Sequence, residues 1–313
     1  SGGDRAPDDP ANGVTLHFWI GAQVEGEVEI EVLDADGTVI REFEGELREP
    51  DPEEEDEPET TEAEEDEPDE DESDDPEDPN LEEEELEVEP GMNRFVWDLR
   101  YPGPDVIEGA QFSLAYTGGM WAPPGLYTLR VEAGEEEREV QVRVGLDPRN
   151  PSVTNADMAA QFELARQVRD RLTEVHEAIR EIRSIREQTS SYVERTREGD
   201  HPEATVEALE DRAEALDEAL TEMEEALIQT RSESGQDPIN FPPKLDDQLA
   251  YLYSHVTGSY GRPTAGSYDR FRDLVQETQP VLDRLDRTVL EEVQAFNRAL
   301  ADAGIGSVVT RVR

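Results

Sequence analysis

The sequence predicts a multidomain protein with an Ig- or FnIII-like β-sandwich followed by an antiparallel three-helix bundle with one short extra helix. Residues 1–48 and 91–146 alternate apolar and polar side chains, as half-buried strands do. From Thr154 onward, apolar side chains recur instead at the three- or four-residue spacing that is typical of amphipathic helices. A length of 313 residues suggests two domains, which we place at 1–148 and 149–313.

The alternating segments predict six or seven short strands, a number typical of a β-sandwich. Asp34-Ala-Asp-Gly37 separates the second and third strands and is typical of a hairpin turn. A calcium loop would need further spaced ligands and a distal glutamate, so the turn is favoured. The predicted strands cover residues 14–20, 28–32, 39–43, 95–99, 126–131 and 140–144.

The second half of the chain carries three long apolar stripes and one short one. The turn at 198–202, Glu-Gly-Asp-His-Pro, joins the first two stripes, and so short a loop makes their helices antiparallel neighbours. Pro280 lies inside the last stripe and should kink that helix. The stripes could bind a partner helix, but three of them are enough to cover one another. They run over residues 158–182, 206–227 and 271–300, with the short helix at 245–256.

The charge is strongly acidic, with 80 Asp and Glu against 28 Lys and Arg, and a net charge of -52. Binding to nucleic acid or to anionic lipid requires a cationic surface, and no apolar run is long enough for membrane insertion. Lys244 is the only lysine. This composition is typical of a protein that works in concentrated salt, where repulsion between carboxylates is screened. An acidic surface shaped for a cationic ligand is the alternative.

Residues 49–90 form an acidic tract of 27 Asp and Glu without Lys or Arg. The remaining 271 residues therefore carry about -25, since -52 + 27 = -25. The tract has too few apolar side chains to offset the entropy of ordering, so we expect a disordered insert at 49–85. Leu86 and Val88 should re-enter the sheet. Diffuse cations are the expected ligands of the tract, and a specific calcium site is the alternative.

The sequence contains no recognisable catalytic, cofactor-binding or metal-binding residues. Cysteine is absent, and the four histidines lack metal-ligand spacing. The motifs of phosphate loops, dinucleotide-binding turns and serine or zinc hydrolases are also missing. Trp19, Trp97 and Trp121 could form a sugar platform, but Trp97 alternates with core positions and Trp121 lies in a loop. Asp98 and Arg100 are expected to form an ion pair.

Two segments carry a recognisable pattern, GMNRFVWDLRYP at residues 91–102 and PPGLYTLR at residues 123–130. They resemble the C-terminal region of large secreted bacterial proteins with sortilin-like or BNR-repeat β-propellers, often labelled sialidase-like or glycosyl hydrolase. The strands are also similar to the Ig-like domain of flagellar hook-capping proteins. Further matches lie at residues 147–149, 240–245 and 262–264. The acidic tract departs from the family pattern.

This resemblance implies an extracellular, periplasmic or cell-surface location and a β-propeller that precedes the matched region. It carries over no catalytic residue, because the matched region is the accessory one. The sequence begins at Ser1 without a methionine or signal peptide, so we expect a fragment or a processed product.

We therefore expect a non-catalytic scaffold that packs on, or extends from, a β-propeller of the same precursor or assembly. An accessory part of a glycoside hydrolase cleft and a cell-surface adhesion or filament-associated module are the alternatives. The interface is expected to use aromatic residues that lie in loops or off the main stripes. The same side chains could instead seal the junction between sandwich and bundle. These residues are Trp121, Phe241, Tyr251, Tyr253 and Tyr260.

Overall fold

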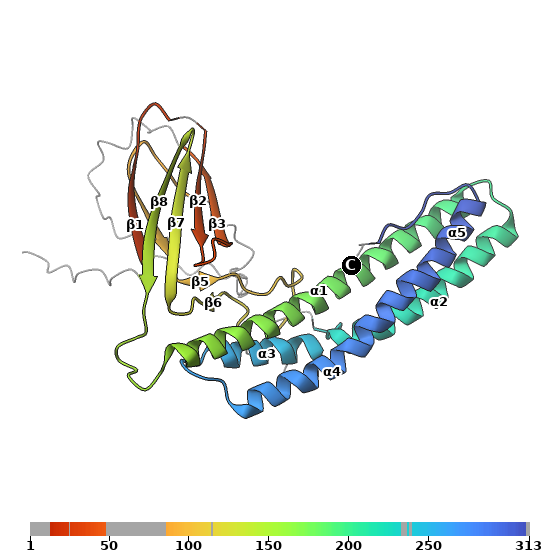
Figure 1. Ribbon diagram of the computed structural model, residues 1–313. Helices are drawn as coiled ribbons and strands as arrows, with labels where there is room; N and C mark the ends of the chain where they lie inside the picture. The colour runs from red at the N-terminus through yellow and green to blue at the C-terminus, as the bar shows by residue number, and fades with distance from the viewer. Residues whose placement is uncertain are drawn as a thin grey trace, which may run out of the picture. The chain divides into compact units, whose positions relative to one another are not determined.

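The computed structural model describes residues 13–24, 26–47, 86–113, 115–232, 237 and 240–310. The chain divides into two compact units, residues 1–102 with 118–159 and residues 103–117 with 160–313. The first unit contains antiparallel sheets and the second contains helices (Figure 1). The predicted combination of a β part and a helical part is thus confirmed. The predicted insert at 49–85 lies outside the described residues.

Strands of the β unit form one four-stranded sheet and two pairs within the described residues. The larger sheet has the order β3-β2-β7-β8, and the pairs are β1-β4 and β5-β6. All of these pairings are antiparallel. The strands are β1 (Val14–Ile20), β2 (Glu27–Leu33), β3 (Val39–Glu46), β4 (Gly91–Trp97), β5 (Arg100–Tyr101), β6 (Met120–Trp121), β7 (Gly125–Ala133) and β8 (Glu136–Val144).

The core of the β unit is built around Trp97, whose side chain is 0% exposed. Its indole lies 5.1 Å from the Tyr127 ring, measured between centroids, and its Nε1 donates a hydrogen bond to the Arg100 carbonyl at 3.1 Å. Phe43 and Phe95 pack edge to face at 4.8 Å. One cluster thus includes side chains from β2, β3, β4 and β7, and the predicted core position of Trp97 is confirmed.

The strand expected at 95–99 ends at Trp97, so the prediction that Leu99 continues it is wrong. Leu99 has a φ of 64°, in the left-handed region that non-glycine residues seldom adopt. This reversal directs the chain into β5. The Asp98 carboxylate supports the turn by accepting the Arg100 backbone N–H at 2.9 Å. The expected ion pair is also present, with Arg100 Nε 3.6 Å from Asp98 Oδ2.

The turn at residues 34–37 is confirmed. Asp34 Oδ1 accepts the backbone N–H groups of Asp36 and Thr38, at 2.9 and 3.0 Å. Farther along, Leu86 N donates to the Glu44 carbonyl at 2.9 Å, and Leu47 forms a parallel bridge with Val88. The two ends of the acidic insert are therefore held next to each other by the sheet.

Replacing residues 50–80 with a short Gly/Ser linker should leave the fold of the β unit intact. The reason is that Leu47 and Val88 are already adjacent, and the cost of closing a loop depends only weakly on its length. Circular dichroism and the melting temperature, measured in molar KCl, check this. Loss of the native spectrum in the shortened chain would show that the acidic insert contributes structure.

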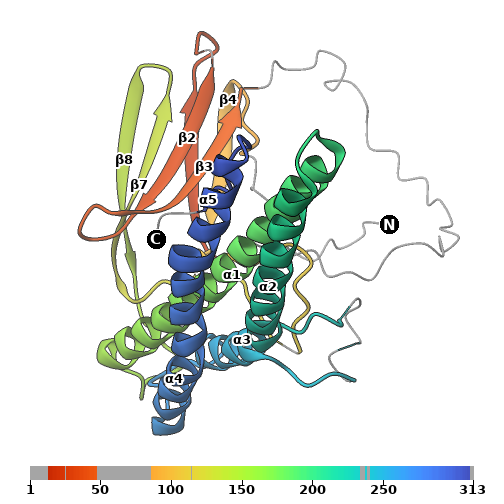
Figure 2. The same ribbon diagram turned by 90° about the vertical axis from the view of Figure 1, so that its right-hand side faces the viewer.

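The helical unit consists largely of long helices that run alongside one another (Figures 1 and 2). The turn at 199–202 joins the first two of these helices as predicted, and the helix that contains Pro280 continues uninterrupted to Thr288. A π-helical turn follows there. None of the described helices has the length and apolar character of a membrane span. The helices are α1 (Asn155–Glu198), α2 (Glu203–Leu227), α3 (Leu245–Thr257), α4 (Ala265–Thr288), the π-helix η2 (Val289–Val293) and α5 (Gln294–Asp302).

Candidate functional site

The helical unit contains a cleft of about 570 Å³ between α3 and the start of α4. Its lining combines aromatic, hydroxyl and charged side chains. The residues around it are Ser113, Pro243, Asp247, Gln248, Tyr251, Leu252, His255, Thr264, Gly266, Ser267 and Arg270. A cleft with a partly apolar lining and a few polar groups is the usual form of a binding site.

Two adjacent carboxyls occupy the first turn of α3. Asp247 lines the cleft, and its Oδ1 accepts the backbone N–H of Ser113 at 2.9 Å. Asp246 is buried behind it and accepts the backbone N–H of Asp247 at 2.7 Å. Through its bond to Ser113, Asp247 connects residues 103–117 to α3. Burial raises the pKa of Asp246 to about 7, and it raises the pKa of Asp247 as well.

The opposite wall comes from the start of α4. Thr264 caps this helix by accepting the backbone N–H of Ser267 at 3.2 Å. Arg270 donates to Gln248 across the cleft and pairs with Glu277 at 2.9 Å. These polar groups bond to each other, so they shape the cleft and hold α3 against α4. A cleft whose polar walls are held in place in this way can bind a ligand or a partner without rearranging.

Tyr251 is the predicted interface residue that lines this cleft, and 59% of its surface is exposed. Tyr260, just beyond α3, is also exposed. Phe241 is half-buried and lines a separate pocket of about 190 Å³ with Pro242 and Lys244. The structure thus brings Tyr251 to the cleft and places Phe241 elsewhere in the same unit.

The prediction that Tyr253 lies off the packed stripes is wrong, because this side chain is fully buried. It lies four residues after Leu249 and three before Val256, so it belongs to the apolar face of α3. Tyr251 is two residues away and projects from another side of the helix. The spacing of Leu249, Tyr253 and Val256 could have revealed this burial in the sequence.

Trp121 belongs to the β unit, where 41% of its surface is exposed. The Arg100 guanidinium lies over its ring, 3.8 Å from the centroid. The same guanidinium donates to the Gly119 carbonyl at 2.5 Å through Nη1. These contacts fix the indole at the surface of β6, where it presents a rigid aromatic face. Such a face is a typical anchor for a binding partner.

His176 is a buried histidine that was not predicted as a site residue. It lies on α1 and is fully buried, and its Nδ1 accepts the backbone N–H of Ile107 at 3.3 Å. Burial, reinforced by Arg180 and Arg183, lowers its pKa to about 3. The ring is therefore neutral at ordinary pH. Its position within the apolar stripe of α1 was the available signal.

Neighbouring contacts hold the same segment on α1. Thr173 Oγ1 accepts the backbone N–H of Asp105 at 3.0 Å, and Arg180 pairs with the Asp105 carboxylate at 2.6 Å. The Phe112 ring packs edge to face on His176, with 5.8 Å between centroids. Residues 103–117 lie between two strands in the sequence, yet these contacts attach them to the helices.

A buried carboxylate joins α1 to α2. Glu224 accepts hydrogen bonds from Arg183 and Arg186, both at 2.7 Å. Burial alone would raise the pKa of Glu224, but these two guanidinium groups bring it below its usual value. Two arginines on one carboxylate are a strong, geometrically defined contact, so this group fixes the pairing of the two helices.

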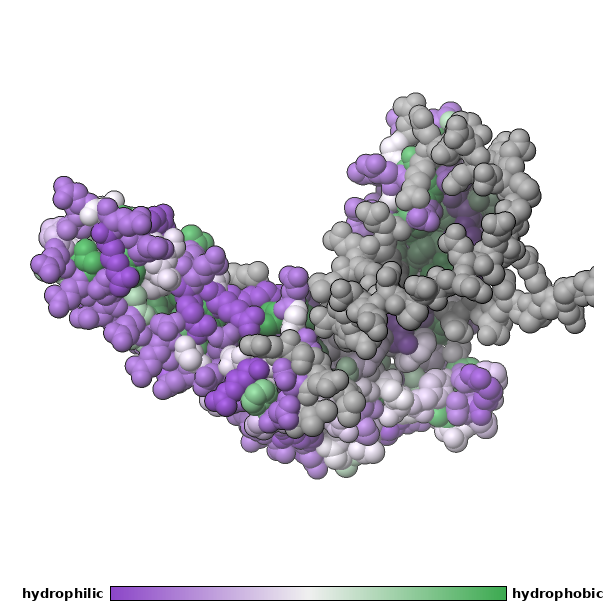
Figure 3. Space-filling model, turned by 180° about the vertical axis from the view of Figure 1, so that it is seen from behind, coloured by the Kyte–Doolittle hydropathy of each residue, from purple (hydrophilic) through white to green (hydrophobic). Residues whose placement is uncertain are grey.

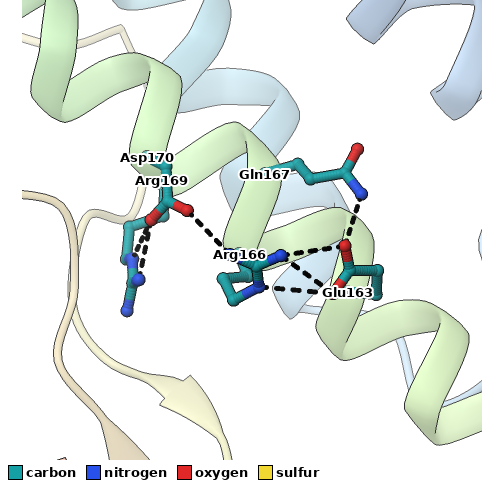
Figure 4. Close-up of polar contacts among 5 residues, drawn as sticks. All are labelled: Glu163, Arg166, Gln167, Arg169 and Asp170. Atoms are coloured by element: carbon teal, nitrogen blue, oxygen red, sulfur yellow. Dashed lines mark hydrogen bonds and ion pairs between the residues drawn. The ribbon is translucent and has the colours of Figure 1, made fainter.

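Arginines on the exposed side of α1 are shared between several acidic side chains. Arg166 pairs with Glu163 at 3.0 Å and with Asp170 at 3.1 Å, and Arg169 also reaches Asp170, at 2.7 Å (Figure 4). Gln167 donates to Glu163 at 2.6 Å. The hydrogen bonds from Arg166 and Gln167 lower the pKa of Glu163. The face of the helical unit seen in Figure 3 is correspondingly hydrophilic.

Molar KCl should raise the melting temperature of the chain relative to dilute buffer. Outside the acidic tract the charge is about -25, from -52 + 27, and raising the salt from about 0.01 to 1 M shortens the Debye length from about 30 to 3 Å. Calorimetry in KCl and in NaCl of equal ionic strength separates screening from a specific ion effect. A melting temperature independent of both salts would contradict the repulsion argument.

Within the described residues, no group of three or more His, Asp or Glu side chains is arranged to hold a metal ion. Comparisons with protein-family models, with curated proteins and with solved structures found no match to this chain. The cleft, the exposed aromatic side chains and the charge of the chain are the features from which a function can be proposed.

Proposed function

We propose that this chain is a non-catalytic interaction region of a secreted, salt-adapted protein, and that its partner is a β-propeller of the same precursor or assembly. In this proposal the β unit is an Ig- or FnIII-like sandwich with a core shared by the sheets. The helical unit is an antiparallel three-helix bundle, with α3 as the short extra helix. Its location is extracellular, periplasmic or at the cell surface.

The cleft beside α3 is the observation that carries this proposal. It presents a largely exposed aromatic side chain, Tyr251, on a helix whose opposite face is buried. The polar side chains around it, including Asp247 and Arg270, already bond within the protein. A partner would therefore gain mainly from covering Tyr251 and the neighbouring apolar lining. Aromatic side chains surrounded by polar groups often dominate binding energy at interfaces.

A carbohydrate-binding role in a glycoside hydrolase cleft is the second candidate. The presence of the Asp247 carboxylate and the Tyr251 ring in one open cleft favours it. A glycosidase requires two carboxyls placed about 5–10 Å apart across the sugar. Asp246 and Asp247 are instead neighbours in one helical turn, and the first is buried. The scaffold function is therefore preferred.

Replacing Tyr251 with alanine should weaken binding to the β-propeller about thirtyfold or more, because truncating a hot-spot aromatic costs about 2 kcal/mol or more. Titration calorimetry of the purified full chain with the recombinant propeller, in molar KCl, measures this. Tyr268→Ala is the matched control, since Tyr268 is an exposed tyrosine of α4 that does not line the cleft. Equal affinities of the two variants would contradict the assignment of the cleft.

A further inference from the structure

β1 is an edge strand without the usual protection. It pairs with β4 on one side, and no other described strand pairs with it. Edge strands commonly carry charged residues or proline, which discourage pairing with other chains. The β1 sequence VTLHFWI contains no acidic residue, lysine, arginine or proline, whereas the edge strands β3 and β8 of the larger sheet carry several glutamates.

A groove of about 250 Å³ opens between β1 and the end of the larger sheet. Leu16 and Phe18 of β1 line one side, and Leu129 and Val131 of β7 line the other. Val140 of β8 also lines the groove, and 48% of its surface is exposed. The groove is thus apolar although it lies at the surface.

Val140 faces the same side of β8 as the core. Alternate residues of a strand share a face, and Val142 and Val144 of the same strand pack against the hydrophobic cluster of the β unit. At Val140 this inner face of β8 is left uncovered. An additional strand beside β1 would lie over it.

We propose that β1 accepts an extended strand from another protein, a segment with apolar side chains at alternate positions and basic residues between them. The backbone of the strand would pair with the free edge of β1. Its alternate apolar side chains would fill the groove over Val140. This mode of recognition takes its affinity from main-chain hydrogen bonds and its specificity from the alternate side chains.

Composition and charge identify this occupant. The acidic tract of the chain itself offers only Ala63 and Leu81 as apolar residues between 49 and 85, so it cannot supply an alternating apolar face. The total charge of -52 attracts a basic segment. Glu136, Arg138 and Glu139 line the groove, where Arg138 pairs with Glu136 and Arg130 pairs with Glu139. The preference for a basic segment therefore comes from the net charge of the chain. A carboxylate-rich strand would meet repulsion there.

A second copy of the chain is the less favourable occupant of this edge. It carries the same net charge of -52, so two copies repel each other, whereas a basic strand is attracted.

The test uses the full chain in 0.15 M KCl, where the Debye length is still about 8 Å, and a fluorescent peptide of sequence KVTVKVTVK with blocked ends. Fluorescence anisotropy should give an affinity about tenfold or more above that for a shuffled peptide of the same composition without alternation, a difference of 1.4 kcal/mol. Hydrogen exchange should show new protection of β1 amides in the complex. Val140→Lys should weaken binding about tenfold or more, since a long cation would occupy the groove.

Val39→Lys is the matched control, because Val39 is an exposed valine on β3 at the opposite edge of the larger sheet. The affinity of this variant for KVTVKVTVK should equal that of the wild type. Val140→Gln removes the apolar contact without added charge if the lysine variant fails to fold. No binding of KVTVKVTVK, equal binding of the shuffled peptide, or wild-type affinity in both Val140 variants would overturn the proposal. A dimer of the free chain with protected β1 amides would also overturn it.

Discussion

Replacing Trp97 with alanine should lower the free energy of unfolding by about 3–5 kcal/mol, the usual range for a large buried aromatic side chain. The indole is fully buried, packs on Tyr127 and bonds to the Arg100 carbonyl. Its removal leaves a cavity at the centre of the β unit and removes the hydrogen bond to the Arg100 carbonyl. Denaturant titration in molar KCl, followed by circular dichroism, measures the change.

Trp121→Ala is the control for this experiment. Trp121 is exposed, and its main contact is the guanidinium of Arg100 over the ring. Contacts of this kind at exposed sites contribute about 0.5–1 kcal/mol. Trp97→Ala should therefore cost several times more than Trp121→Ala. A loss below about 1 kcal/mol at Trp97 would be incompatible with a core position.

Acid should remove the stability that the chain derives from a neutral His176. The folded pKa is about 3, below the usual histidine value of 6.5, so the unfolded state takes up a proton first as the pH falls. This contribution is complete above pH 6.5 and decreases toward pH 3, by up to about 1.4 kcal/mol per pH unit. The advantage of the wild type over His176→Leu should therefore shrink by about 2 kcal/mol between about pH 6.5 and 5.

Asp246→Asn provides a control of opposite sign. Burial raises the folded pKa of Asp246 from 3.8 to about 7, so the folded state holds the proton more tightly and its contribution is lost as the pH rises through this window. The advantage of the wild type over Asp246→Asn should therefore increase as the pH falls from 7 to 5. Equal pH dependence of the two comparisons would contradict the assigned environments.

Periodicity predicted most of the secondary structure because it follows directly from which faces are buried. The alternation of Val28, Ile30 and Val32 gave β2, and all three are fully buried. The stripes at residues 158–182 and 206–227 gave α1 and α2, with the turn between them correctly placed. These elements bury one face against their own unit, so the pattern of the sequence records their neighbours.

Other features depend on contacts between residues far apart in the chain. The attachment of residues 103–117 to the helices rests on the Asp105 contacts with Thr173 and Arg180 and on the Ser113 contact with Asp247. No local pattern indicates such pairs. The left-handed backbone of Leu99 is likewise a tertiary effect, since leucine has no intrinsic preference for it.

The candidate site was predictable only in part. Tyr251 and Trp121 were expected to remain outside the packed stripes, and both are exposed. The cleft itself requires α3, α4 and the segment that contains Ser113, whose association the sequence does not reveal. The pairing of charges was also not predictable, because the sequence shows how many arginines there are but not which carboxylate each one contacts. Arg183 and Arg186, for example, both donate to Glu224.

The most direct test of the proposed function is native mass spectrometry of the protein recovered from its source, with sequencing of any co-purifying chain. We expect a complex with a β-propeller, or a single polypeptide that contains both the propeller and this region, and no glycoside turnover by the isolated 313-residue chain. Recovery of the chain alone, together with hydrolysis of a glycoside or sialoside by the purified material, would contradict it.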